Sequence, residues 1–231
     1  LTEAPIFIAA LNKPKPKTLP MMEVIVTHFK PLFLGMLICI AGYVLFYIMI
    51  AFSQIYAKSA PTVSEAGYAM GLGFSPQIFT ALLMCSAISL AITIAISGKY
   101  IDIVGRRIWL IWTTFGVAIF GLALPYFLDN GTTTSLFWFL MIGMALIGMG
   151  YGPLASFLPE LFPTHARYSG ASLTYNISGL FGASVAAIIA LPLNANYGLK
   201  GVGIYLTLNA IVSLIGLWFI AETKDKTLNL G

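Results

Sequence analysis

The charged residues that could do chemistry gather in two short segments, each placed between long apolar runs. The first begins at Gly98 and ends at Arg107, with the sequence Gly-Lys-Tyr-Ile-Asp-Ile-Val-Gly-Arg-Arg. Gly98 and Gly105 allow helix ends to turn and to approach each other. Asp102 can accept hydrogen bonds from the free N–H groups at a helix start, and Arg106 and Arg107 can anchor a helix end among lipid headgroups. We therefore expect a compact charged hinge between two helices.

The second segment joins Glu160 to Arg167 within the sequence Pro-Glu-Leu-Phe-Pro-Thr-His-Ala-Arg-Tyr-Ser-Gly. Opposite charges at a membrane boundary can pair without full desolvation, so this pair could hold helix ends together in one conformation and release them in another. The simpler interpretations are an ordinary basic loop for the first segment and a solvated pair, worth at most about 1 kcal/mol, for the second. We predict a cytoplasmic gate that comprises Gly98, Asp102, Gly105, Arg106, Arg107, Glu160 and Arg167.

Neutral polar residues are the second group with a chemical use. All eight acidic residues lie in loops or at the ends of apolar runs, so no charge is expected near mid-membrane. Tyr43 and Tyr47 are four residues apart and share a helix face with Gln54, while Tyr175 and Asn176 lie near the middle of a later run. We predict that these five line a substrate cavity. The alternative is that they hydrogen-bond neighbouring helices.

The sequence gives no sign of an enzyme. It has no nucleophile–base pair, no phosphate-binding loop and no clustered metal ligands, so neither a cofactor nor a metal is predicted. Cys39 and Cys85 fall in apolar runs and are interpreted as packing residues. His28 and His165 lie at the edge of the apolar runs, where a proton relay would lack a partner at mid-membrane.

Composition places these residues on membrane helices. The chain is 59% hydrophobic and 9% charged, with a mean hydropathy of +0.92, whereas soluble domains are about 25% charged. A spanning helix needs about 20 apolar residues, and the runs are too long for barrel strands. We predict an all-α, polytopic bundle of six transmembrane helices at residues 31–57, 78–98, 108–128, 135–158, 168–193 and 202–221.

The net charge of +4 is distributed as a topology signal and not as a nucleic-acid surface. Ten of the twelve basic residues fall on one side of the predicted membrane, and only Lys58 and Lys200 fall on the other. Basic residues favour the cytoplasmic side, so both termini of this segment are expected there. We predict a cytoplasmic linker at 1–30, the bundle at 31–221 and a cytoplasmic tail at 222–231.

The two charged segments also carry a family resemblance. The hinge that ends at Arg107 resembles the loop between the eighth and ninth helices of major facilitator transporters. The segment from Glu160 to Gly170 resembles the tenth-to-eleventh helix connection of the metabolite:proton symporter group, and the Glu-Thr-Lys sequence from Glu222 and the Phe-Tyr pair at Tyr47 are similar to the same group. A departure is Gly42-Tyr43, where that group often places Asn or an acid.

The resemblance covers only the carboxyl-terminal half of a twelve-helix protein, so it implies a missing amino-terminal six-helix half as a partner. It implies transport of a small polar metabolite, an organic acid or a zwitterion, across a bacterial inner membrane, driven by protons through alternating access. Proton coupling comes from the resemblance and not from these residues. The alternatives are an uncoupled facilitator or antiporter of the same fold, and a truncated membrane scaffold without transport.

Overall fold

The computed structural model of this chain describes residues 20–223. The remainder of the predicted linker, residues 1–19, and residues 224–231 of the predicted tail lie outside this range. The described residues are overwhelmingly helical, and their only extended pairing is an isolated bridge between Val63 and Ala69. The predicted all-α class is confirmed.

Helices follow one another along nearly the whole described chain. Two of them, η1 and η2, are five-residue π-helical turns set inside longer helices. In chain order the elements are α2 (Pro20–Thr27), α3 (Phe29–Tyr47), η1 (Ile48–Phe52), α4 (Ser53–Lys58), α5 (Pro76–Val104), α6 (Arg106–Leu128), α7 (Thr133–Glu160), α8 (Arg167–Gly179), η2 (Leu180–Ser184) and α9 (Val185–Phe219).

These elements make the six predicted spans. Five continuous helical segments are long and apolar enough to cross a membrane, and the last of them, Arg167–Phe219, contains a sharp break at Gly198 that divides it into two spans. Gly198 has φ 67°, a left-handed conformation that suits glycine, and a Cβ there would lie 2.6 Å from the Tyr68 ring. A one-residue break therefore connects the two spans that the sequence analysis placed at 168–193 and 202–221.

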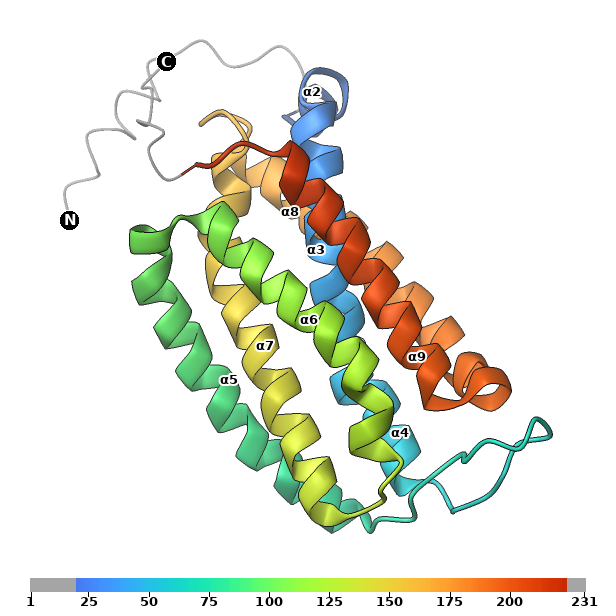
Figure 1. The fold of residues 1–231 in the computed structure, drawn as a ribbon. Coiled ribbons are helices and arrows are strands. Elements are labelled where there is room, and N and C mark those ends of the chain that lie inside the picture. Colours follow the sequence, from blue (N-terminus) through green and yellow to red (C-terminus); the bar gives the residue numbers. More distant parts are fainter. Residues whose placement is uncertain (1–19, 224–231) are drawn as a thin grey trace.

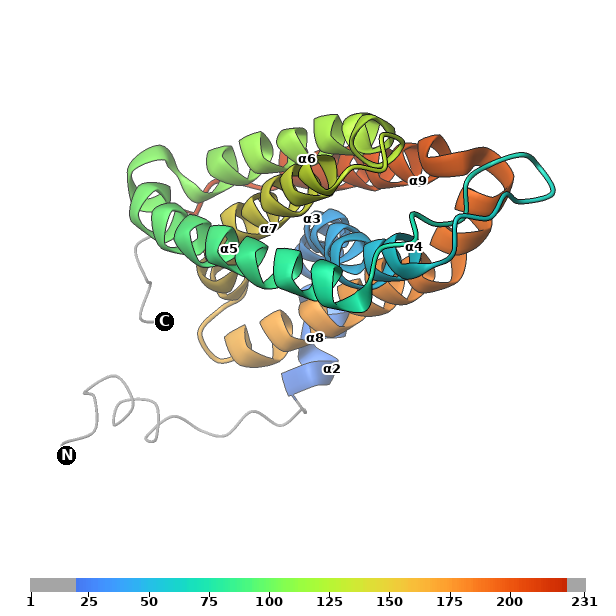
Figure 2. The same ribbon diagram turned by 90° about the horizontal axis from the view of Figure 1, so that it is seen from below.

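The first span forms the centre of the bundle. Figure 2 shows α3 and α7 in the middle, with α6 and α9 along one side and α5 and α8 along the other. Half of the apolar window of the first span is buried, compared with 17% for α5, which packs mainly against α7. Leu45, Ile48, Met49 and Phe52 are fully buried around the end of α3 and η1. The first span is therefore the element against which α7, α8 and α9 are arranged.

Small residues and hydroxyl groups hold the helices close together. A Cβ on Gly121 of α6 would lie 2.8 Å from the Gly203 carbonyl of α9, so these two helices touch through their backbones. Nearby, the Thr207 hydroxyl donates to the Ala118 carbonyl at 3.0 Å, and the Ser213 hydroxyl donates to Leu37 of α3 at 2.6 Å. Packing and interhelical hydrogen bonds of this kind replace the hydrophobic driving force that is missing between helices in lipid.

The two ends of the bundle differ in charge, as the sequence predicted. The α5–α6 turn, the α7–α8 connection and the end of α9 lie together at the top of Figure 1, and we call this the basic end because Arg106, Arg107 and Arg167 lie there. Lys58 and Lys200 lie at the opposite, loop end, with the long connection 59–75. Part of the predicted linker is also ordered at the basic end, as the helix α2.

Candidate substrate site and gate

Arg106 connects three helices at the basic end. It is the first residue of α6, and it lies 3.4 Å from Asp102 near the end of α5. Its other terminal nitrogen makes an ion pair with Glu160, the last residue of α7. The Arg106 and Glu160 side chains are only 18% and 23% exposed, whereas that of Asp102 is 71% exposed. The pair with Glu160 is therefore the better shielded of the two and the one whose loss would cost more.

The predicted pair between Glu160 and Arg167 is not formed. Within residues 20–223, Arg167 makes no ion pair, and its buried Nε has no hydrogen-bond partner. The connection between the two residues is closed by tight backbone turns, such as that of Ala166 onto Pro163 at 3.0 Å, and these turns start α8 on a separate helix axis. The partner of Glu160 comes instead from α6, which the local spacing could not reveal.

Glu222, and not Asp102, caps the start of α6. Its carboxylate accepts hydrogen bonds from the backbone N–H of Arg106 at 3.0 Å and of Arg107 at 3.1 Å. These are two of the N–H groups that an α-helix leaves without an internal partner. A Cβ at Gly105, whose φ is 105°, would lie 2.9 Å from the same carboxylate, so glycine makes room for the cap. The sequence pointed to Glu222 only through the family resemblance of the tail.

Arg107, in turn, caps the end of α9. Its Nε donates to the Leu217 carbonyl at 2.8 Å and its Nη2 donates to the Trp218 carbonyl at 3.1 Å, both in the last turn of α9. Arg107 thus caps the end of α9, a role that the sequence did not predict beside its predicted headgroup contact. Gly98 is also placed differently from the prediction, because it lies inside α5 with no atom within 4 Å of its Cβ position, and Gly105 alone makes the turn.

Three tyrosines gather where α3, α7 and α8 meet. Tyr43 packs against Gly179 and Gly182, and a Cβ on Gly182 would lie 2.7 Å from the Cβ of Tyr43. Tyr175 packs against the same buried cluster as Tyr43, and Tyr151 of α7 lies near both. Sequence reasoning missed Tyr151, although its position nine residues before Glu160 matches the depth of Tyr175, eight residues after Arg167. Both lie about 12–14 Å from the basic end along their helices.

The other predicted cavity residues differ from this group in depth or in the helix face on which they lie. The Tyr47 hydroxyl, one turn beyond Tyr43, donates to the Ala187 carbonyl at 3.4 Å. Gln54 is exposed on α4, about 16 Å along the helix from Tyr43. Asn176 directly follows Tyr175 but lies on the exposed face of α8, where it donates to the Ser172 carbonyl of its own helix at 2.8 Å and lines an open hollow. The structure therefore brings together Tyr43 and Tyr175, with Tyr47 adjacent, and leaves Gln54 and Asn176 apart.

Both π-helical turns lie beside this tyrosine group. The turn η1 begins immediately after Tyr47, and η2, which contains Gly182, packs against α3. Single π-turns inside α-helices often mark functional sites, because they disturb the regular hydrogen-bond ladder. The spans that carry Tyr43 and Tyr175 each become irregular five to nine residues beyond these tyrosines.

Six apolar helices with polar groups at mid-depth and ion pairs at one end define a polytopic membrane protein. Over residues 60–230 the chain matches the family described as "Sugar (and other) transporter". The chain belongs to this family, which is part of the major facilitator superfamily, and its relatives are transporters and not enzymes.

Among its relatives are two Haemophilus influenzae proteins with the name "Putative metabolite transport protein", one of which is 88% identical over 99% of the chain and 51% of the relative. The inner membrane metabolite transport protein YhjE of Escherichia coli is 36% identical over 99% of the chain and 50% of its own length. The chain thus spans about half the length of the curated relatives it matches. No solved structure matches it significantly.

The capping role of Glu222 can be tested by substitution. Glu222→Ala removes the acceptor for the first N–H groups of α6, so we expect a loss of about 0.5–2 kcal/mol of stability, measured as thermal unfolding in mild detergent. Glu222→Gln keeps one acceptor oxygen and is expected to lose less. The matched control is Glu65→Ala, an exposed position in the connection at the loop end. Equal stability of the two alanine variants would show that the cap contributes nothing.

Proposed function

We propose that this chain is part of a secondary active transporter that moves a small polar metabolite across the bacterial inner membrane, by proton-coupled symport and alternating access. The observation that carries the proposal is the tyrosine group at mid-depth in a bundle of a transporter family, between spans that contain π-turns. The excess of basic residues supports a cytoplasmic position for the basic end. The second six-helix half of the transport path is then supplied by a part of the transporter outside this chain.

The chemistry of the tyrosine group favours a zwitterion or an organic acid. Phenol hydroxyls donate to carboxylate oxygens, and aromatic faces attract quaternary or secondary ammonium groups. The Glycine betaine/proline/ectoine/pipecolic acid transporter OusA of Dickeya dadantii, 27% identical over 208 residues, supports the inclusion of zwitterions among the candidates. In this proposal Tyr43, Tyr47 and Tyr175 contact the substrate, and Gln54 and Asn176 line the paths to either side of it.

The ion pairs at the basic end suit a gate. Arg106 ties the start of α6 to the end of α7, and Glu222 and Arg107 tie α6 to α9, so these helices move together while the contacts hold. In this proposal the contacts stabilise the state that is closed to the cytoplasm. Arg167, which has no ion-pair partner within residues 20–223, is the cation that in this proposal pairs with a group outside this chain in the closed state.

Transport and its coupling are tested together with the native-length protein in a weakly buffered cell suspension. Addition of proline, glycine betaine or a dicarboxylate is expected to give accumulation of one of these labelled compounds with alkalinisation of the medium. Accumulation to equilibrium without alkalinisation would contradict proton symport and favour the facilitator. No uptake of any member of a broad metabolite panel by a well-expressed protein would contradict transport itself and favour the scaffold.

The substrate contact is tested by removing one hydroxyl. Tyr175→Phe is expected to raise the KM for uptake by about tenfold or more, because a hydrogen bond to a charged carboxylate contributes about 1.5–3 kcal/mol. The matched control is Tyr126→Phe, since Tyr126 is 76% exposed at the far end of α6 and belongs to no cluster of hydroxyls. A KM that is unchanged in the Tyr175 variant, or raised equally in both variants, would rule out Tyr175 as a substrate ligand.

The gate is tested by comparing its two carboxylates. Glu160→Gln leaves the shielded Arg106 without its main partner and is expected to lower uptake by about fivefold or more, which corresponds to about 1 kcal/mol. Asp102→Asn removes only an exposed contact and is expected to change uptake by less than about twofold.

The accessibility of the hollow from the cytoplasmic side is measured by maleimide labelling of Ser172→Cys in inside-out vesicles, in a Cys85→Ser background. Equal labelling and equal uptake in the Glu160 and Asp102 variants would contradict the proposed gate.

A further inference from the structure

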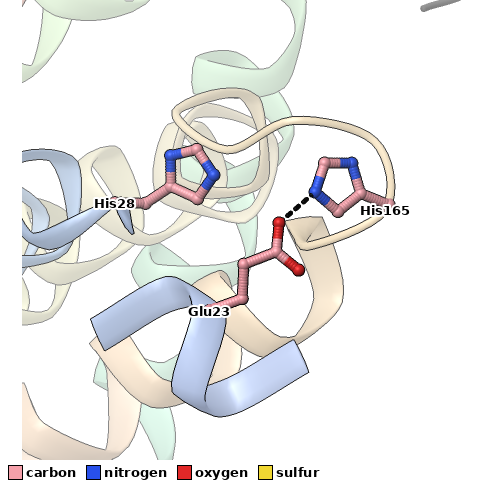
Figure 3. A group of neighbouring side chains, drawn as sticks. All are labelled: Glu23, His28 and His165. Carbon is pink, nitrogen blue, oxygen red and sulfur yellow. Dashed lines mark hydrogen bonds and ion pairs between the residues drawn. The ribbon is translucent and has the colours of Figure 1, made fainter. Parts of the chain in front are cut away.

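A group of potential metal ligands lies at the basic end, away from the tyrosines and from the Arg106 ion pairs. Glu23 comes from α2, His28 lies at the junction of α2 and α3, and His165 lies in the connection between α7 and α8 (Figure 3). One ligand atom of each residue lies within 4.8 Å of the others. The sequence predicted no clustered metal site, because these residues are distant along the chain and meet only in the fold.

A small apolar core fixes the segments that carry these ligands. Val24 and Leu32, which flank His28, pack with Phe162 and Ala166, which flank His165, and all four are at most 5% exposed. The backbone bends at His28, with φ −116° and ψ 34°, and this bend turns α2 toward the α7–α8 connection. The ligands are therefore held by packing beneath them, and their meeting does not depend on their own hydrogen bond.

The hydrogen bond between Glu23 and His165 involves only two of the three potential ligands and leaves out His28. Glu23 Oε1 lies 2.6 Å from His165 Nε2, while the two imidazole rings are 6.5 Å apart between centroids. The His28 ring is directed toward the same space in Figure 3 but makes no hydrogen bond to any residue within 20–223. The His28 imidazole is a third ligand beside the Glu23–His165 pair, which a metal ion would use and a simple ion pair would leave unused.

We propose that Glu23, His28 and His165 bind a divalent transition-metal ion of the zinc class, with a water molecule at the fourth position. Two imidazoles and a carboxylate form a ligand set that zinc takes in proteins, with bonds of about 2.0–2.2 Å. With such bonds, the ligand atoms of a tetrahedral site lie about 3.3 Å from one another. Side-chain rotations that move each ligand atom by about 1 Å would convert the present arrangement into a bound one. Nitrogen and oxygen ligands exclude a preference for the softest ions.

The ion would join the segment before the first span to the connection between α7 and α8. That connection has Glu160 at one end and Arg167 at the other, so a bound ion would restrain the same helix ends that form the proposed gate. Slower uptake at zinc concentrations that fill the site is the expected consequence. This consequence rests on the proposed transport function, whereas binding of the ion does not.

Binding is tested on the native-length protein, purified in detergent without a polyhistidine tag and stripped with a chelator. Titration with Co²⁺ is expected to give one equivalent with the absorption of a tetrahedral site, displaced by Zn²⁺. His28→Ala and His165→Ala are expected to weaken binding by at least about tenfold, with Glu65→Gln as the matched control. Absence of a tetrahedral equivalent, or equal affinity in the two histidine variants and the control, would overturn the proposal.

A variant that gains a spectroscopic signal distinguishes loss of a ligand from loss of the fold, because an unfolded variant would lose metal binding without gaining a new band. In a Cys85→Ser background, His165→Cys replaces an imidazole by a thiolate, which is also a zinc-class ligand. The cobalt form of this variant is expected to show a thiolate-to-cobalt charge-transfer band that the parent protein lacks. A cobalt spectrum without that band would place the ion elsewhere and would contradict ligation by residue 165, whatever the uptake assay reports.

Discussion

Helix ends are the costly part of a membrane bundle, since their free N–H and C=O groups find few partners near hydrocarbon. At the basic end, residues at the ends of α6 and α9 supply hydrogen-bond partners for each other's free backbone groups. Glu222, just after α9, accepts from the first N–H groups of α6, and Arg107, in the first turn of α6, donates to the last carbonyls of α9. With both ends satisfied, the neighbouring Arg106 is held at the helix start with its guanidinium directed to Glu160. The arrangement of α5, α6, α7 and α9 at this end follows from that reciprocal cap.

Away from the caps, the bundle is held by contacts that are close but not charged. Backbone approach at Gly121 and Gly203 and the hydroxyl of Ser213 bring α6 and α9 against each other and against α3. The tyrosine group lies where this dense packing gives way to π-turns, on the spans that include α3 and α8. The molecule thus combines a densely packed side, α6 with α9, and a less regular side that carries the polar groups.

Run length and charge bias predicted the six spans and their alternation, since burial in lipid requires long apolar helices whatever their partners are. Interactions between distant segments could not be predicted in this way. The spacing suggested Asp102 as a cap and Arg167 as the partner of Glu160, whereas the fold uses Glu222 and Arg106, which arrive from other helices. Tyr151 was missed for the same reason, because only the crossing of α7 with α3 and α8 brings it to Tyr43 and Tyr175. Periodicity specifies helices, but the choice of partners depends on tertiary packing.

The break at Gly198 has a consequence for how the protein is made. A single left-handed residue joins the last two spans, and the Ser64 hydroxyl and the Asn194 amide fasten the connection 59–75 onto the helix beside it. Little chain is left there to form a separate loop between the two spans. We therefore expect the last two spans to enter the bilayer together, as a helical hairpin.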